Sequence, residues 1–196
     1  MYDLDEVTEI IMNQCKKDRF ILGIDGLSRA GKTTLVNDLQ QKLIARQKPV
    51  CIFHIDDHIV ERNKRYDTGF EQWYEYYYLQ WDVAFIQQQF LSKLSHAQEI
   101  SIPYYNSELD KVEMKTVTMN SNCIIIIEGV FLQRSPWREY FDFIIYLECA
   151  REKRFDRETA SSKHNLDKFK LRYWKAEDYY LNTVQPRTHA DMVIFS

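Results

Sequence analysis

Residues 26–33 of this chain read Gly-Leu-Ser-Arg-Ala-Gly-Lys-Thr, which has the pattern G-x-x-x-x-G-K-[ST]. The stretch follows a short apolar run, residues 20–25, and opens residues 32–46, whose leucines recur at helical spacing. A glycine-containing loop between a buried strand and a helix offers backbone N–H groups and the positive end of the helix to phosphate oxygens. The sequence therefore predicts a site for the phosphates of a nucleotide.

The residue types in this loop suggest a role for each side chain. Gly26 and Gly31 allow the backbone to curl around the phosphates. Lys32 is expected to act catalytically on the β- and γ-phosphates, and Thr33 to offer its hydroxyl to Mg²⁺. An ordinary helix start with a surface lysine is disfavoured, because two of only five glycines in the chain occupy the required positions. The residues expected to bind ATP are Gly26, Leu27, Ser28, Arg29, Ala30, Gly31, Lys32, Thr33 and Thr34.

The rest of the chain alternates between apolar runs and amphipathic stretches, which is typical of an α/β fold. We expect one domain over residues 1–196, with a doubly wound, mainly parallel sheet and helices on both faces. The predicted helices are residues 3–17, 32–46, two within 70–94, 150–161 and 166–183. The predicted strands are residues 20–25, 50–55, 99–105, 115–119, 122–127, 143–147 and 192–195.

Composition limits the classes of partner. The 196 residues carry a formal net charge of -3, which argues against a protein that holds nucleic acid mainly by charge. The acidic start is unlike a secretory signal, and no apolar run approaches the ~20 residues that span a bilayer. The four scattered cysteines suit a reducing compartment. We therefore expect a cytoplasmic protein with no nucleic-acid or membrane partner, and a homo-oligomer is left open.

Acidic residues follow the predicted strands, where ligands bind in open α/β sheets. Asp56 and Asp57 follow residues 50–55, and Glu128 follows residues 122–127. We expect Asp56 to be the base that accepts a proton, and Glu128 to be the acid beside the metal. Asp57 is expected to bind substrate or to cap the next segment, and Asp25 to be one of the acids near the cradle or a hydrogen-bonding partner within its own loop.

Basic residues cluster just after the strand predicted at residues 143–147. Arg154 and Arg157 lie three apart and would share one face of a helix. Cations over the transferring phosphoryl group stabilise its developing charge. We therefore expect both arginines to be catalytic, within a small helical lid at about residues 150–165. A solvated surface helix is the alternative interpretation.

Together these residues resemble the uridine kinase and phosphoribulokinase family of P-loop kinases. The resemblance is carried by residues 24–34, 55–57, 102–105, 126–129 and 154–157. It implies a P-loop NTPase fold and Mg²⁺-dependent transfer of the γ-phosphate of ATP to a hydroxyl of a small metabolite such as a nucleoside. It also implies that Asp56 is the base, that Tyr105 contacts substrate and that the lid arginines touch the phosphates.

The chain departs from this family's pattern on the acceptor side. Uridine kinases carry a Phe-Asp-His-Pro-like stretch whose acid holds the ribose hydroxyls, and residues 74–82 differ from it. Asp110 stands near the place of a family histidine that helps to read the pyrimidine. Asp82 and Glu75 are expected to hold ribose-like hydroxyls instead. The aromatic side chains of residues 66–85 are expected in the core more than in a substrate site.

Two further classes compete with a small-molecule kinase. A GTPase switch needs an Asn-Lys-x-Asp stretch, but the only Asn-Lys pair is followed by Arg65 and Tyr66. A P-loop protein that binds nucleotide and acts through partners, without kinase activity, is not excluded. The cradle, Asp56 and Glu128 together favour the kinase.

Overall fold

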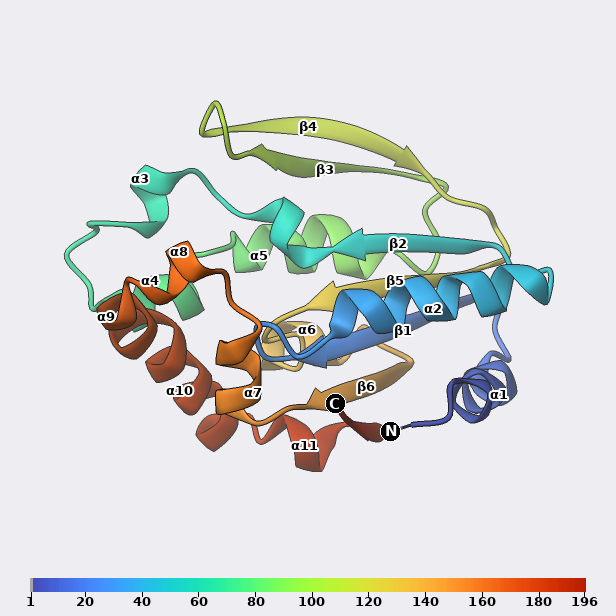
Figure 1. The fold of residues 1–196 in the computed structure, drawn as a ribbon. Coiled ribbons are helices and arrows are strands. Elements are labelled where there is room, and N and C mark those ends of the chain that lie inside the picture. The colour runs from blue at the N-terminus through green and yellow to red at the C-terminus, as the bar shows by residue number, and fades with distance from the viewer. Residues whose placement is uncertain (1) are drawn as a thin grey trace.

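The computed structural model describes residues 2–196, and a parallel sheet forms its centre (Figure 1). The strands lie in the order β2-β5-β1-β6-β7, and all neighbours are parallel. Their bounds are β1 (Arg19–Gly26), β2 (Val50–His54), β5 (Cys123–Gly129), β6 (Phe143–Glu148) and β7 (Met192–Phe195). The predicted doubly wound α/β fold is confirmed, and each of these strands matches its predicted range within two residues.

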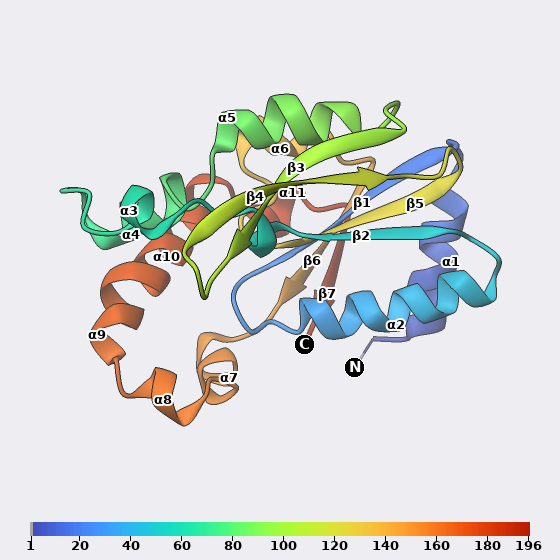
Figure 2. The same ribbon diagram turned by 90° about the horizontal axis from the view of Figure 1, so that it is seen from above.

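Helices cover both faces of the sheet (Figure 2). The helices α1 (Leu4–Gln14) and α2 (Lys32–Ala45) pack on one face, against Ile124 and Ile126. The other face receives Ile125 and Ile127, and it is covered by α4 (Gln72–Tyr78), α5 (Val83–Phe85), α6 (Ser135–Arg138) and α10 (Lys175–Thr183). Every residue of β1 and β5 is buried, as a strand covered on both faces requires.

Two helical segments contain π-helical turns. Helix α5 continues through a π turn at Ile86–Phe90 and a 3-10 turn at Leu91–Lys93. The helix predicted at residues 166–183 is α9 (Leu166–Lys168), a π turn at Phe169–Trp174, and then α10. Turns of this kind frequently accompany functional sites. Within residues 2–196, no helix has the length and apolar character needed to cross a bilayer.

A hairpin stands apart from the main sheet, above the β2 edge in Figure 1. Its strands β3 (Glu99–Asn106) and β4 (Lys111–Thr118) pair antiparallel. The strand predicted at residues 115–119 begins four residues earlier, because the chain turns tightly at residues 107–110 and Asp110 adopts a left-handed φ of 49°. The side chain of His58 joins the hairpin to the segment after β2, with 2.6 Å between its Nδ1 and the carbonyl oxygen of Pro103.

The segment after β6 forms an arc beside the phosphate-binding loop (Figure 2). It contains α7 (Arg151–Asp156) and α8 (Ala160–Lys163), where one helix had been predicted over residues 150–161. The break has a local cause, because the Thr159 hydroxyl accepts a hydrogen bond from the backbone N–H of Ser162 and starts a new helix. The short helices α3 (Arg62–Arg65) and α11 (Pro186–His189) complete the chain.

A buried hydrogen-bond network ties the sheet to α10. The carboxylate of Asp25 accepts from the Tyr180 hydroxyl at 2.6 Å, from Gln133 Nε2 at 2.9 Å and from the backbone N–H of Leu132 at 3.3 Å. Burial raises the pKa of Asp25, while these donors act in the opposite direction by stabilising its charge. Asp25 therefore stabilises the structure around its loop, which is the alternative that its sequence position had left open.

Removing the Tyr180 hydroxyl should destabilise the fold. Tyr180→Phe leaves the buried carboxylate without its shortest donor, and we expect a loss of about 1–3 kcal/mol in the free energy of unfolding. The loss should be larger at pH 8 than at pH 5, because the hydroxyl stabilises the charged form of Asp25. Urea titrations at both pH values measure it.

Tyr179→Phe is the matched control on the same helix, since among residues 2–196 that hydroxyl bonds only the Tyr78 hydroxyl, on an exposed surface. A change below about 0.5 kcal/mol is expected there. Equal losses for the two variants would contradict a special role for the buried network.

Candidate active site

The predicted phosphate-binding loop surrounds its own lysine. Gly31 caps α2 with a left-handed φ of 102°, a conformation that a side chain would strain. The Lys32 ammonium donates a hydrogen bond to the carbonyl oxygen of Leu27 at 3.1 Å, and Lys32 is only 9% exposed. Burial lowers the pKa of Lys32, whereas the nearby carboxylates of Glu128 and Asp56 act to raise it. The negative charges of these two acids thus offset part of the cost of burying the Lys32 ammonium.

A close backbone approach brings those acids together. Asp56 lies in the 3-10 turn η1 (Ile55–His58) after β2, and Glu128 lies at the carboxyl end of β5. At Gly129 a Cβ atom would come within 2.0 Å of the Ile55 side chain, so only glycine lets β5 pack against this turn. Both carboxylates therefore line the same cavity as Lys32.

Asp56 has the electrostatic environment of a base. Asp56 is exposed to the open cavity, yet the protein packed around it partly desolvates its carboxyl. This desolvation raises the pKa of Asp56, and the negative charges of Glu128 and Asp57 raise it further, while Lys32 acts in the opposite direction. A carboxyl with a raised pKa holds a proton more readily than an ordinary aspartate. Asp56 is thus suited to accept the proton of a hydroxyl in the cavity.

Glu128 combines with Thr33 to offer oxygen ligands. Its Oε1 accepts from the Thr33 hydroxyl at 2.9 Å and lies 2.7 Å from His54 Nδ1. Its Oε2 has no hydrogen-bond partner within residues 2–196. Carboxylate and hydroxyl oxygens suit Mg²⁺, which in nucleotide sites is held by few protein groups together with phosphates. The described residues accordingly hold no cluster of three or more His, Cys, Asp or Glu side chains with metal-binding geometry.

A cavity of about 1080 Å³ opens beyond the carboxyl ends of the strands. This volume lies at the upper end of the range of about 300–1000 Å³ that is typical of ligand-binding cavities. One part is lined by the phosphate-binding loop and the segment after β6. The part beyond Asp56 is lined by Ile59, Tyr66, Tyr76, Gln80, Lys168, Phe169 and Tyr173, which we call the acceptor end.

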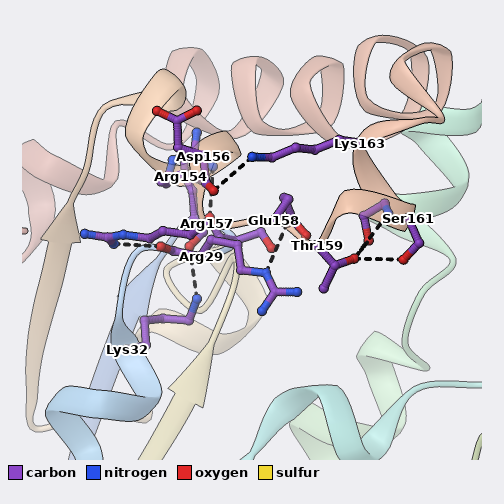
Figure 3. A network of polar contacts seen from close by, with 12 residues as sticks. Arg29, Lys32, Arg154, Asp156, Arg157, Glu158, Thr159, Ser161 and Lys163 are labelled. Carbon is purple, nitrogen blue, oxygen red and sulfur yellow. Dashed lines mark hydrogen bonds and ion pairs between the residues drawn. The ribbon is translucent and has the colours of Figure 1, made fainter.

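Polar contacts hold the segment after β6 over the loop (Figure 3). Arg157 donates to the backbone carbonyl of Arg29 at 2.9 Å, and the Arg29 side chain pairs with Glu158 at 3.2 Å. Lys163 donates to the carbonyl oxygen of Asp156 at 3.0 Å. Arg157 lines the cavity and lies beside the loop, where the sequence had predicted a cation.

Arg154 has a different environment from Arg157. It is 4% exposed and forms a bidentate pair with Glu177, with distances of 2.8 and 2.9 Å. It also donates to the carbonyl oxygens of Ser28 and Cys149, each at 3.1 Å. The solvated-surface interpretation is therefore wrong for Arg154. Its side chain lines the cavity while it ties the phosphate-binding loop to α10, so it positions the loop.

The three residues predicted to bind substrate lie outside the cavity lining. Asp82 accepts through Oδ1 from the backbone N–H of Phe85 at 2.9 Å and caps α5, and its role in substrate binding stays a prediction. The Tyr105 hydroxyl donates to Asp110 at 2.9 Å, and Asp57 is exposed in the η1 turn. Their contact with a substrate stays a prediction.

The carboxylate of Glu75 is likewise occupied by contacts within the protein. One of its oxygens lies 3.0 Å from Arg172 Nη1, and the other accepts from the backbone and hydroxyl of Thr68. Both side chains of the ion pair are almost fully buried. Glu75 therefore joins α4 to the π turn before α10 and leaves no oxygen for a ligand.

The structure also brings into the site residues that the sequence did not single out. His54 touches Glu128, and Gln80 and Lys168 line the acceptor end. The Lys168 ammonium lies 5.6 Å from the Tyr66 ring and 5.5 Å from the Tyr173 ring, and it has no ion-pair partner among residues 2–196. Nothing in spacing or composition marks these residues, because segments far apart in sequence meet there.

A phosphate-binding loop at the end of a parallel strand, with a buried lysine and two acids around a large cavity, defines a kinase of the P-loop class. The chain belongs to the phosphoribulokinase / uridine kinase family, whose model matches residues 21–196. Members of this family are ATP-dependent phosphotransferases with a hydroxyl acceptor, and this chain is one of them. The resemblance inferred from the sequence is confirmed.

The chain is similar to known proteins over nearly all of its length. The uridine kinase of Psychromonas ingrahamii is 24% identical over 195 residues, with 91% of this chain and 88% of that protein covered. The uridine kinase of Borrelia duttonii is 25% identical over 186 residues, with coverage of 89% and 85%.

The structure of the chain is also similar to solved structures of other proteins. A possible uridine kinase from Bacillus stearothermophilus is 47% identical with a TM-score of 0.88, covering 97% of this chain and 96% of that one. A D-glycerate 3-kinase from Cryptococcus neoformans var. grubii shares only the fold, at 10% identity and a TM-score of 0.62, with coverage of 98% and 95%.

Replacing Lys32 should abolish most of the phosphoryl transfer. Lys32→Met keeps much of the side-chain volume but removes the cation that faces the phosphates, and we expect kcat to fall by about 10²-fold or more. ADP formation in the presence of acceptor measures the loss. Lys42→Met, on an exposed part of the same helix, should keep wild-type kcat. Retained turnover in Lys32→Met would contradict the assignment of the site.

Proposed function

We propose that the chain is a Mg²⁺-dependent nucleoside kinase that transfers the γ-phosphate of ATP to a primary hydroxyl. The observation that carries the proposal is the position of Asp56, which lines the cavity and is close enough to both Lys32 of the phosphate-binding loop and Tyr76 of the acceptor end for its charge to act on them. Phosphoryl transfer needs a base in this position, because the attacking hydroxyl must lose its proton where it meets the γ-phosphate.

The nucleotide occupies the part of the cavity at the phosphate-binding loop. Backbone N–H groups at the start of α2 and the Lys32 ammonium bind the phosphates. Residues 150–165 act as a lid within a single kinase domain, and Arg157 supplies a cation at its edge. The contacts of Arg157 and Glu158 with Arg29 support this arrangement, because they already hold the lid against the loop.

Thr33 and Glu128 would hold the magnesium ion. The hydroxyl of Thr33 and the unpartnered Oε2 of Glu128 provide oxygen atoms of the type that Mg²⁺ prefers. The ion would neutralise part of the negative charge on the β- and γ-phosphates. His54 fixes the orientation of the Glu128 carboxylate through Oε1.

Asp56 would activate the acceptor. Its carboxylate accepts the proton of the primary hydroxyl while the hydroxyl oxygen bonds to the γ-phosphorus and the bond to the leaving ADP breaks. Lys32 lies on the phosphate side and stabilises the transferred charge. The pKa of Asp56 is raised and therefore lies closer to neutral pH than that of an ordinary aspartate. A general base is most effective when its pKa is close to the working pH.

A nucleoside suits the acceptor end. Tyr66, Tyr76, Phe169 and Tyr173 give this part of the cavity an aromatic wall on which a planar base can stack. The similar proteins named uridine kinase make pyrimidine nucleosides the first acceptors to test.

An acceptor screen tests the proposal directly. With Mg-ATP, uridine and cytidine should raise ADP formation above the rate without acceptor, and the product should carry a 5′-phosphate. Ribose, pantothenate and glycerate serve as non-nucleoside alcohols. A preference for one of these alcohols, or no turnover with any nucleoside, would contradict the nucleoside assignment.

The pH dependence tests the base. A base must be deprotonated, so kcat/KM should fall as the pH drops through the pKa of Asp56, and this limb should lie above the pH range of an ordinary aspartate. Asp56→Asn should lower kcat by about 10²–10⁴-fold and remove the limb.

Asp5→Asn, on α1 and outside the cavity lining, should keep both the rate and the limb. An unchanged acid limb in Asp56→Asn would show that another group is the base.

A further inference from the structure

The backbone of Arg29 is an unusual feature of the phosphate-binding loop, because it adopts a left-handed φ of 61°. A residue with a side chain is less stable in this conformation than glycine, which adopts it without steric cost. Such residues cluster at functional sites, where the surrounding structure holds them in place. The contacts of Arg29 show what holds this one.

Arg29 holds two consecutive residues of the segment after β6 (Figure 3). Its backbone carbonyl oxygen accepts a hydrogen bond from Arg157 Nη1 at 2.9 Å. Its side chain forms an ion pair with Glu158, with 3.2 Å between Nε and Oε1. The side chain of Glu158 is only 10% exposed, and among residues 2–196 it forms no other ion pair. Arg29 therefore anchors the chain just after α7 through both its backbone and its side chain.

The contact with the backbone of Arg29 places the Arg157 guanidinium close to Lys32. A Cβ atom at Gly31 would lie 3.8 Å from Arg157 Nη1. The Ser196 hydroxyl lies 3.3 Å from both terminal nitrogens of Arg157 and supports the guanidinium from another side. Gly31 directly precedes Lys32, and both residues line the cavity. The guanidinium is thus held at the end of the phosphate-binding loop, where a cation can face phosphate oxygens.

The charge of Glu158 is unexpected in this place. Glu158 lines the cavity together with the phosphate-binding loop, and a carboxylate there repels the phosphates of a nucleotide. By charge alone, the site would bind phosphate better without it. The ion pair with Arg29 neutralises this charge and gives the carboxylate a structural partner within the loop.

We propose that Arg29 is a positioning residue, which together with Glu158 holds the Arg157 guanidinium over the phosphates during phosphoryl transfer. The inference rests on the proposed function, because it takes Arg157 as the cation that the lid supplies. The left-handed backbone directs the Arg29 carbonyl oxygen to Arg157, and the ion pair fixes the next residue, Glu158. A cation that is held in place before the reaction stabilises the developing charge without a cost of reorganisation.

Arg157 depends on these contacts more than Arg154 does. Arg154 is buried against Glu177, so the first turn of α7 is fixed without Arg29. The side chain of Arg157 is exposed, and a long exposed side chain that lacks partners samples many rotamers. The contacts with Arg29 and Ser196 restrict Arg157 to the loop.

Removing the charge of Glu158 tests the inference by the sign of its effect. With Mg-ATP and uridine, Glu158→Gln should lower kcat by about 2- to 5-fold, the size expected for a partly exposed ion pair. The KM for uridine should not change. Charge alone predicts the opposite, because losing a negative charge beside the phosphates favours both ATP binding and transfer. Glu152→Gln, at an exposed position of α7, is the matched control and should keep the wild-type kcat.

Arg29→Gly separates positioning from stability. Glycine suits the left-handed backbone but makes the unfolded chain more flexible, so the melting temperature should change little. We expect kcat to fall by at least as much as in Glu158→Gln, because the ion pair is lost here too. A merely structural role would lower the melting temperature together with kcat in both variants.

Replacing Arg157 shows whether Arg29 and Glu158 act through it. Arg157→Met should lower kcat by about 10-fold or more. In this background, Glu158→Gln and Arg29→Gly should have no further effect on kcat. An equal fold-loss with and without the Arg157 guanidinium would show that the pair acts in another way, and it would overturn the inference.

The remaining outcomes separate the inference from the proposed function. A wild-type kcat in Arg157→Met, or a raised kcat in Glu158→Gln, overturns the inference and leaves the nucleoside kinase intact. If the wild type phosphorylates no nucleoside, the proposed function is overturned. The same variants are then compared by ATP hydrolysis without an acceptor, which still decides the inference, because transfer to water develops the same charge on the phosphoryl group.

Discussion

The buried ammonium of Lys32 is the constraint on which the site depends. The Lys32 ammonium is tolerated in this buried position because the carbonyl oxygen of Leu27 and the nearby carboxylates offset the cost of removing it from water. Those acids come from two other strands, so the loop is electrostatically coupled to the turn after β2 and to the end of β5. The close approach at Gly129 makes this coupling possible, since a side chain there would push the turn away. Lys32, Asp56 and Glu128 are thus parts of one electrostatic arrangement.

Buried ion pairs extend this arrangement to the helices of the second half of the chain. The pair between Arg154 and Glu177 joins the phosphate-binding loop to α10, and the pair between Arg172 and Glu75 joins α4 to the preceding π turn. Buried pairs contribute little net stability, but they penalise alternative packings that leave a charge unpaired. Their effect here is to fix where the lid and the acceptor end lie relative to Lys32.

The acceptor end differs in character from the phosphate end. Its wall is aromatic, and Glu75 on α4 is paired with Arg172 and accepts hydrogen bonds from Thr68. Glu75, which the sequence suggested for binding ribose, therefore stabilises the fold.

The sequence determined the phosphate-binding loop, the parallel sheet and the placement of Asp56 and Glu128 at strand ends. These are local: a motif, an apolar run and the residue that follows it are adjacent along the chain, so spacing alone reveals them. The helical segment after β6 was predicted in the same way, although the break at Thr159 was missed, because a hydroxyl cap is a weak signal within a helical pattern.

Only the tertiary structure decided what each remaining side chain does. Arg154 and Arg157 look equivalent in sequence, yet one is buried against Glu177, a partner 23 residues away, and the other lies at the cavity edge. Asp82 and Gln80 are two positions apart, and the direction of their side chains makes one a helix cap and the other a cavity wall. Such roles depend on which distant segments meet, and that is fixed by packing and by the compensation of buried charge.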